Sequence, residues 1–292
     1  MSNVTAKPRI ATQPAANARQ QQSTALMVRS LRRVFLTRKG ASVEALSDVS
    51  LTVRQDEVIA ILGPSGCGKS SLLRILAGLD TDYVGDIEWS LRDASDSLDQ
   101  RLLSATVFQA DSTFPWMNVE KNVAIGLSGL NLASDDVNRR VARYVGLVGL
   151  TKFLHAFPHE LSGGMRQRVA IARALATEPL LLLMDEPLAA LDAQTRFIMQ
   201  KELLQIWKQT NSTVIYITHD IGEALTLADR IVVMTARPGR IKMIQNVPFS
   251  RDRDVIQLRA QPEFGKLESE LWQLVAEEVG SSLEGSCVEG DE

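Results

Sequence analysis

The chain has 292 residues, of which 45% are hydrophobic and 23% are charged, proportions that are ordinary for a globular protein. Its formal net charge of −3 does not fit a general nucleic-acid binder, which normally carries a basic face, so we expect no nucleic-acid partner. The two cysteines, Cys67 and Cys287, are too few and too far apart for a disulfide framework or a cysteine metal site. A reducing compartment fits this composition best.

The first 25 residues differ in composition from the rest of the chain. They are rich in Gln, Ala, Thr and Asn, and they contain no apolar block of the kind that a secretory signal requires. Their lack of acidic residues is a weak similarity to an organelle transit peptide, but their low hydrophobicity favours a disordered, solvated tail. No apolar run in the chain approaches the ~18 residues of a transmembrane helix, so we expect none.

From residue 26 onward, short apolar runs alternate with segments of helical periodicity. The run Val58–Leu62 is continuously apolar, which suits a strand covered on both faces of a parallel sheet. Ser134 is predicted to cap a helix whose first turn holds Asp135 and Asp136, and Pro262 is predicted to open a last amphipathic helix. Strands that alternate with helices predict a mainly parallel α/β sheet. The predicted strands are Val28–Phe35, Ala45–Val53, Val58–Leu62, Ala105–Phe108, Leu180–Met184, Val214–Thr218 and Ile231–Met234.

A glycine-rich segment follows the run Val58–Leu62 and precedes a helix predicted over Ser70–Ala77. Two glycines spaced by four residues and followed by Lys and Ser form the pattern of a phosphate-binding loop. Glycines let the backbone approach a phosphate closely, and the helix N-terminus favours the anion. Lys69 would supply a positive charge to the β- and γ-phosphates, and the Ser70 hydroxyl would ligate Mg²⁺. A purely structural glycine turn is the alternative, but the strand–loop–helix context argues against it. The expected ATP contacts here are Gly63, Pro64, Ser65, Gly66, Cys67, Gly68, Lys69, Ser70 and Ser71.

Two carboxylates, Asp185 and Glu186, come directly after the apolar run Leu180–Met184. The carboxyl ends of parallel strands form the edge at which ligands bind in open α/β sheets. Asp185 is therefore placed to hold Mg²⁺, and Glu186 to orient or deprotonate an attacking water. A solvated turn would be the default interpretation of two carboxylates alone, but the phosphate loop favours the catalytic one. His219 follows the strand Val214–Thr218, where it could donate to the γ-phosphate and fix the geometry of the water and the base.

The segment Leu161–Arg168 reads Leu-Ser-Gly-Gly-Met-Arg-Gln-Arg. Together with the phosphate loop, the Asp185-Glu186 pair, the Leu191-Asp192 dipeptide and His219, it resembles the ATP-binding cassette (ABC) family over about residues 26–238. A helix cap with basic residues is the alternative for this segment. The resemblance implies an ABC ATPase domain of the P-loop NTPase class. Such a domain has a RecA-like, mainly parallel core, an antiparallel β subdomain and a helical signature subdomain, and it uses ATP and Mg²⁺.

The resemblance also implies that each ATP site is shared by two copies of the chain in a two-fold homodimer. Ser162, Gly163, Gly164 and Gln167 match the signature that contacts ATP held by the opposite subunit. Asp192 matches the residue at the dimer seam.

Two further positions are assigned by the same resemblance. Gln109 matches a glutamine that ligates Mg²⁺ and water and senses the membrane partner. Phe35 matches the aromatic that stacks on adenine, although an aromatic at a strand end often merely packs. The catalytic set implied in this way is Glu186, His219, Gln109 and Lys69, and the Mg²⁺ set is Ser70, Gln109 and Asp185.

Among ABC proteins, the sequence favours a transport ATPase over two other classes. A DNA-repair or translation ATPase would carry a second cassette, a long coiled coil or zinc-binding cysteines, and a non-enzymatic nucleotide binder would not keep Glu186, His219 and Ser162. The segment Phe114–Trp116 resembles that of ATPase subunits in nitrate, sulfonate and taurine importers. It suggests a docking site for an integral membrane permease near Gln109, with ordinary core packing as the alternative.

This resemblance implies a place on the cytoplasmic face of the bacterial inner membrane, with a periplasmic solute-binding protein in the complex. The expected organisation is a disordered tail over residues 1–25, the ABC domain over 26–246, a C-terminal extension with an amphipathic helix over 247–280, and an acidic flexible tail over 281–292. One departure from the family pattern is the polar segment 88–100, which lacks the usual glycine-centred turn.

Overall fold

A computed structural model describes residues 9–11, 23–37, 40–90, 103–108 and 112–286 of the chain. Its internal contacts divide the chain into two compact units. The first unit combines residues 1–98 with residues 215–292, and the second unit comprises residues 99–214. Each unit is described by itself below.

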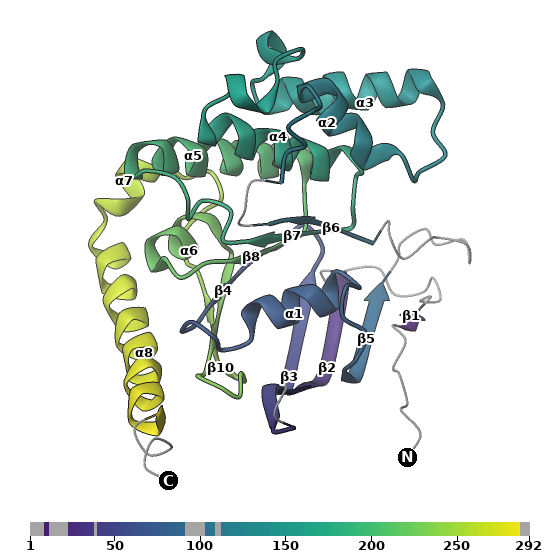
Figure 1. Cartoon of the computed structure of the whole chain (residues 1–292). Coiled ribbons are helices and arrows are strands. Elements are labelled where there is room, and N and C mark those ends of the chain that lie inside the picture. Colours follow the sequence, from purple (N-terminus) through teal and green to yellow (C-terminus); the bar gives the residue numbers. More distant parts are fainter. Residues whose placement is uncertain (1–8, 12–22, 38–39, 91–102, 109–111, 287–292) are drawn as a thin grey trace. The chain divides into compact units, whose positions relative to one another are not determined.

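A mainly antiparallel sheet occupies the N-terminal part of the first unit (Figure 1). Strands β2 and β3 form its long hairpin, and β5 pairs antiparallel with the other edge of β2. From Ser47 to Arg54, buried and exposed positions of β3 alternate, with Val49, Leu51 and Val53 buried, as expected for a sheet with one face on a core. The strands are β1 (Arg9–Ala11), β2 (Thr24–Leu36), β3 (Ser42–Arg54) and β5 (Val84–Ser90), in the order β1-β5-β2-β3.

Strand β1 lies within the segment that we expected to be a disordered tail. It pairs parallel with β5, from Arg9 opposite Glu88 to Ala11 opposite Ser90. An edge strand offers unpaired backbone groups, which explains how a polar segment without an apolar pattern can add a strand there. Strand β2 also begins at Thr24, before the residue 26 boundary, because Thr24 pairs with Arg54 of β3. Residues 1–8 and 12–22 lie outside the described part.

A second sheet in the first unit surrounds β4 (Val58–Leu62), which matches the predicted strand and is buried along its whole length. Strand β9 (Arg230–Met234) pairs parallel with β4, and β10 (Ile241–Asn246) pairs antiparallel with β9. On the other side of β4, Thr218 donates its N–H to the Ile61 carbonyl, directly after β8 (Val214–Ile217). Helices α1 (Lys69–Leu76) and α6 (Ile221–Leu227) follow β4 and β8.

The C-terminal extension belongs to the first unit and contains α7 (Val255–Arg259) and α8 (Pro262–Ser286). Phe264 and Leu271 of α8 are buried, as the predicted amphipathic pattern requires. Helix α8 continues through residues 281–286, which were expected to form a flexible tail. No proline interrupts this stretch, so the backbone can continue the helix. Residues 287–292 lie outside the described part.

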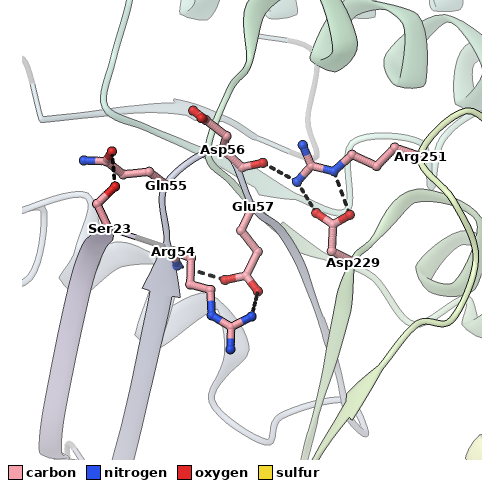
Figure 2. Close-up of a pocket in the computed structure, with 7 residues that line it drawn as sticks. All are labelled: Ser23, Arg54, Gln55, Asp56, Glu57, Asp229 and Arg251. Atoms are coloured by element: carbon pink, nitrogen blue, oxygen red, sulfur yellow. Dashed lines mark hydrogen bonds and ion pairs between the residues drawn. The ribbon is translucent and has the colours of Figure 1, made fainter. Parts of the chain in front are cut away.

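A polar pocket of about 400 Å³ shows how the extension is attached (Figure 2). Arg251 reaches the Asp229 carboxylate and the Asp56 carbonyl, and Asp229 also accepts the N–H of Val58 at 2.8 Å. The pocket therefore lies at the N-terminal end of β4, at the opposite end from the glycine-rich loop. Its charged groups neutralise one another, which fixes the start of the extension. The lining residues are Ser23, Arg54, Gln55, Asp56, Glu57, Asp229 and Arg251.

Parallel strands β6 (Ser104–Val107) and β7 (Leu181–Asp185) and a group of helices form the second unit. Helices α2 and α3 pack against α4, as the upper part of Figure 1 shows. Both strand bounds agree with the sequence prediction to within one residue, the usual uncertainty of element ends. The helices are α2 (Val119–Ala124), α3 (Ser134–Leu147), α4 (Gly163–Ala176) and α5 (Ala193–Thr210), with 3₁₀ turns at Ile125–Leu127, Thr151–Phe153 and Pro158–Glu160.

The predicted cap of α3 is wrong. Ser134 is the first residue of the helix, the extended residue before it is Ala133, and no side chain caps this end. The helix begins one residue earlier than expected, so the Ser134 hydroxyl is past the capping position. Asp135 and Asp136 do lie in the first turn, where their charges favour the helix dipole. Over the described residues, none of the helices is both long and apolar enough to cross a lipid bilayer.

Candidate nucleotide site

The glycine-rich loop connects the buried strand β4 to helix α1, as predicted. Gly66 and Gly68 have φ angles of 77° and 101°, a region that side chains disfavour. A Cβ atom on Gly68 would lie 2.7 Å from the carbonyl oxygen of Ala45. The loop therefore needs glycine both for its turn and for its close approach to β3. This backbone concavity at a helix N-terminus is the form that binds phosphate groups.

Lys69 folds back over the loop. Its side chain is buried, and its ammonium group donates to the carbonyl oxygens of Gly63 at 2.8 Å and Pro64 at 3.0 Å. Two neutral carbonyl acceptors are weaker partners for an ammonium group than a charged oxygen is. A phosphate in the loop would therefore compete well for Lys69. Ser65 and Ser70 are exposed, so their hydroxyls are accessible from solvent.

Cys67 lies inside the same loop and is almost fully buried. Burial raises the pKa of its thiol, and the nearby Lys69 ammonium offsets only part of that effect. The thiol therefore stays protonated at neutral pH, which suits packing rather than nucleophilic chemistry.

His219 is exposed at the end of β8, where the sequence predicted it. The structure adds a buried carboxylate that contacts the residues next to it in the chain. Glu223 accepts hydrogen bonds from the hydroxyls of Tyr216 at 3.0 Å and Thr218 at 2.9 Å. Asp220 caps α6 by accepting the N–H of Glu223 at 2.9 Å. The residues on both sides of His219 are thus fixed by one network.

Glu223 was not predicted as a functional residue from the sequence. The signal was the spacing Asp220-x-x-Glu223 at the start of a helix, which is typical of a capping motif. That pattern predicts an acid in the first turn. It does not predict that the acid is buried under two hydroxyl groups.

We expect Glu223→Ala to lower the free energy of unfolding by about 2–4 kcal/mol, because two buried hydroxyls lose their charged acceptor. Glu223→Gln keeps one acceptor oxygen and should lose less. Denaturant titration of both variants measures the effect, with the exposed Glu263→Ala as the control. Equal stability of the Glu223→Ala and control variants would contradict this role.

Phe35 lies near the end of β2 with 37% of its surface exposed. The guanidinium carbon of Arg33 lies 4.1 Å from the centre of the Phe35 ring. Arg33 is itself held by Asp80 at 2.9 Å and Asp82 at 2.5 Å. Phe35 is therefore a partly exposed ring supported by a fixed cation, and not a core residue. The role of Arg33 was not predictable from the sequence, because nothing in the spacing links it to the acids after α1.

In the second unit, β7 ends at Asp185, and Glu186 follows with a φ angle of 44°. A left-handed conformation is costly for a residue other than glycine and is concentrated at functional sites. The Glu186 carbonyl accepts the N–H of Ala189 at 3.1 Å, which begins the turn that follows. Both acidic side chains are half-buried.

The signature segment opens α4. The Ser162 hydroxyl accepts the N–H of Met165 at 3.3 Å, and Ser162 and Gly163 are exposed. Gly164 is buried, and a Cβ atom there would lie 2.9 Å from the Thr195 side chain. Gln167 is buried in the single chain, on helix α4. The exposed part of the signature consists of Ser162 and Gly163.

Asp192 caps α5, accepting the N–H groups of Thr195 at 3.0 Å and Gln194 at 3.1 Å. These hydrogen bonds lower the pKa of the exposed Asp192 carboxyl. A negative charge at this helix N-terminus is stabilised by the helix dipole. In the single chain, Asp192 is therefore a helix cap on the surface.

Phe114 and Trp116 lie side by side with ring centres 5.5 Å apart, and 69% of Trp116 is exposed. The buried Asn122 holds the segment, because it accepts the Phe114 N–H and donates to the Phe114 and Met117 carbonyls. Core packing is therefore excluded for Trp116. Gln109 lies outside the described residues, as does most of the polar segment 88–100.

Comparison with known proteins agrees with this geometry. The sequence model of the ABC transporter family matches residues 46–189, which include the glycine-rich loop, the signature and the Asp185-Glu186 pair. An uncharacterised ABC transporter ATP-binding protein of Methanocaldococcus jannaschii is 42% identical over 265 residues, covering 91% of this chain and 96% of that protein. The chain belongs to the ATP-binding subunits of ABC transporters. The chain is therefore an ATPase of this family.

Two named relatives of this ABC ATPase are import proteins. The taurine import ATP-binding protein TauB of Jannaschia sp. is 41% identical and covers 88% of this chain and 97% of that protein. The aliphatic sulfonates import ATP-binding protein SsuB of Bacillus cereus is 42% identical, and the match covers 75% of this chain and 86% of that protein.

Solved structures confirm the predicted fold class of the ABC ATPase. The dimeric cassette MJ0796 has a TM-score of 0.64 and 28% identity, and it covers 77% of this chain and all of that chain. The protein cbiO1 of Clostridium perfringens, part of the ABC transporter complex cbiONQ, has a TM-score of 0.68 and 27% identity, and it covers 85% of this chain and 99% of that chain. The predicted mainly parallel core, antiparallel β subdomain and helical subdomain are therefore correct.

The predicted site residues of the ABC ATPase are divided between the two units. The glycine-rich loop with Lys69 and Ser70, together with Phe35 and His219, belongs to the first unit. Asp185, Glu186, the signature and Asp192 belong to the second unit.

Proposed function

We propose that ATP is held by the glycine-rich loop of one protomer and the exposed Ser162 and Gly163 of a second copy. The cassette MJ0796 supports this arrangement, since it is dimeric and a related structure of it holds ADP and phosphate. In this proposal, Phe35 stacks on adenine, supported by Arg33, and Asp192 lies at the dimer seam. Lys69 moves from the carbonyls of Gly63 and Pro64 to the phosphates.

We further propose that hydrolysis uses Mg²⁺, which would be held by the Ser70 hydroxyl, Asp185 and Gln109. The ion would neutralise phosphate charge in this site. Glu186 orients or deprotonates the attacking water, and His219 fixes its position relative to the phosphate. The buried Glu223 network supports the last role, because it fixes the backbone on both sides of His219.

We propose that Trp116 and Phe114 dock onto an integral membrane permease. A large exposed aromatic is normally costly to leave in water, and Asn122 holds this one on a fixed loop. Arg173 supports the base of the surface, since its guanidinium carbon lies 5.5 Å from the centre of the Phe114 ring. This docking would place the protein on the cytoplasmic face of the bacterial inner membrane.

The function that fits best is energising the import of taurine, an aliphatic sulfonate, nitrate or a similar small solute. The observation that carries it is the 41% identity to a taurine import ATP-binding protein across almost its whole length. A periplasmic solute-binding protein would deliver the solute to the permease.

Reconstitution tests this function. The chain is combined in proteoliposomes with its partner permease and solute-binding protein, and uptake of labelled taurine, alkanesulfonate and nitrate is measured. We expect ATP-dependent uptake of one of these solutes, and loss of uptake with unchanged ATP binding in Trp116→Ala. ATP hydrolysis without uptake of any of the three would reject the proposed solute class.

A further inference from the structure

The C-terminal helix α8 contacts the turn that joins β9 to β10. The carboxylate of Glu278 accepts the N–H of Ala236 at 2.9 Å and pairs with the Lys242 ammonium at 2.8 Å. Partial burial raises the pKa of Glu278, but the hydrogen bonds from Lys242 and Ala236 outweigh that effect and leave the pKa below its usual value. The carboxylate is therefore charged at neutral pH and linked to both ends of the turn.

The turn over residues 235–240 has its own internal hydrogen bonds. Thr235 donates its N–H to the Arg240 carbonyl at 2.9 Å, and its hydroxyl oxygen accepts the Arg240 N–H at 3.0 Å. The same hydroxyl lies 3.0 Å from the carbonyls of Ala236 and Pro238. These hydrogen bonds join the end of β9 to the start of β10. A displacement of Ala236 would therefore move the whole turn 235–240.

The far side of this turn lies directly behind the glycine-rich loop. Gly239 donates its N–H to Ala45 at 2.9 Å and accepts the N–H of Ser47 at 3.0 Å. A Cβ atom on Gly239 would lie only 2.0 Å from the Cys67 carbonyl, so backbone meets backbone here. The Arg237 guanidinium also reaches the Gly66 carbonyl at 3.4 Å.

We propose that Glu278 is a positioning residue for ATP binding, acting through the turn 235–240 on the glycine-rich loop. The carboxylate holds Ala236, the turn holds Gly239 against Cys67, and the loop keeps the backbone shape that receives phosphate. The C-terminal extension thus supports the nucleotide site from behind. This inference rests on the assignment of ATP to that loop.

Glu277 provides a matched control, because it pairs with the same Lys242 ammonium at 2.8 Å. Its side chain is 66% exposed, whereas that of Glu278 is 15% exposed. If only the charge near Lys242 mattered, the two glutamates would be equivalent. If the hydrogen bond to Ala236 matters, only Glu278 is required.

The test measures the ATP dissociation constant of the full chain by titration with a fluorescent ATP analogue. We expect Glu278→Ala to raise it by about three- to tenfold, the usual size of coupling through a packed network. Turnover at saturating ATP should stay within about twofold of wild type, giving an effect on KM and not on kcat. Glu278→Gln keeps an acceptor for the Ala236 N–H and should retain wild-type affinity for ATP. Glu277→Ala should also bind ATP like wild type.

A second pair of variants approaches the turn from the other side. Gly239→Ala should weaken ATP binding because its Cβ meets the loop, whereas Gly265→Ala on α8 has no atom within 4 Å of its Cβ and should not. Wild-type affinity in Glu278→Ala, whatever Gly239→Ala shows, or equal losses in Glu277→Ala and Glu278→Ala, would overturn the inference. Failure of the wild-type chain to bind ATP would instead reject the assigned nucleotide site.

Discussion

Replacing Glu186 with glutamine is expected to lower ATP turnover by about 10²–10⁴-fold while ATP binding is kept. The amide has nearly the same shape as the carboxylate but cannot accept a proton from the attacking water, and a general base typically contributes that factor. Binding should not weaken, because the phosphate contacts are assigned to the glycine-rich loop. Phosphate release by the purified chain with its permease measures turnover, and nucleotide titration measures binding.

Glu178→Gln is a suitable control for this substitution. Glu178 is another glutamate of the second unit with a left-handed backbone, at φ 51°, and it precedes β7 as Glu186 follows it. Its carboxylate pairs with Arg140 and Arg143 on the surface, where such pairs contribute at most about 1 kcal/mol. The turnover of Glu178→Gln should therefore match that of wild type. Turnover within about threefold of wild type in Glu186→Gln would remove Glu186 from the role of base.

The sequence predicted best those parts of the site whose functional residues are contiguous in the chain. The glycine-rich loop was predictable because its glycines, Lys69 and Ser70 are contiguous and stand between a buried strand and a helix. The strand at Leu181–Asp185 was predictable for a similar reason, since its apolar run ends abruptly in acids. In both cases the local pattern contained all of the required information.

The parts that could not be predicted depend on contacts between residues far apart in the chain. Arg33 of β2 pairs with Asp80 and Asp82 in the segment between α1 and β5, and Ala236 contacts Glu278 through the packing of α8. No spacing rule connects such residues in a single sequence. The burial of Gln167 was missed for a related reason, because the motif identified the segment but the helix packing decides which face is covered.

Within the first unit, the predicted site residues are held in place by residues that belong to no recognised motif. His219 follows a strand whose end is fixed by Glu223, the Phe35 ring is supported by Arg33, and the glycine-rich loop lies against Gly239. These supporting contacts fix the site residues before ATP binds. Preorganisation of this kind matters because a ligand that must order its own site loses affinity.

Lys69→Ala is expected to weaken ATP binding by about 10²-fold, because charge-assisted hydrogen bonds to phosphate contribute about 1.5–3 kcal/mol each. The structure adds a second consequence. The ammonium group also joins the Gly63 and Pro64 carbonyls, so its loss should loosen the loop even without nucleotide. We therefore expect a lower melting temperature in the apo protein as well as weaker binding.

Thermal denaturation with and without ATP separates these two effects. A ligand at about 100 times its dissociation constant stabilises the folded state by about 2.7 kcal/mol, so wild type should show a clear upward shift. At the same ATP concentration, Lys69→Ala should show almost none, since its site is barely half occupied. Lys266→Ala, which removes an exposed lysine of the same unit, should keep the full shift. An undiminished shift in Lys69→Ala would show that the ammonium group holds the loop but not the nucleotide.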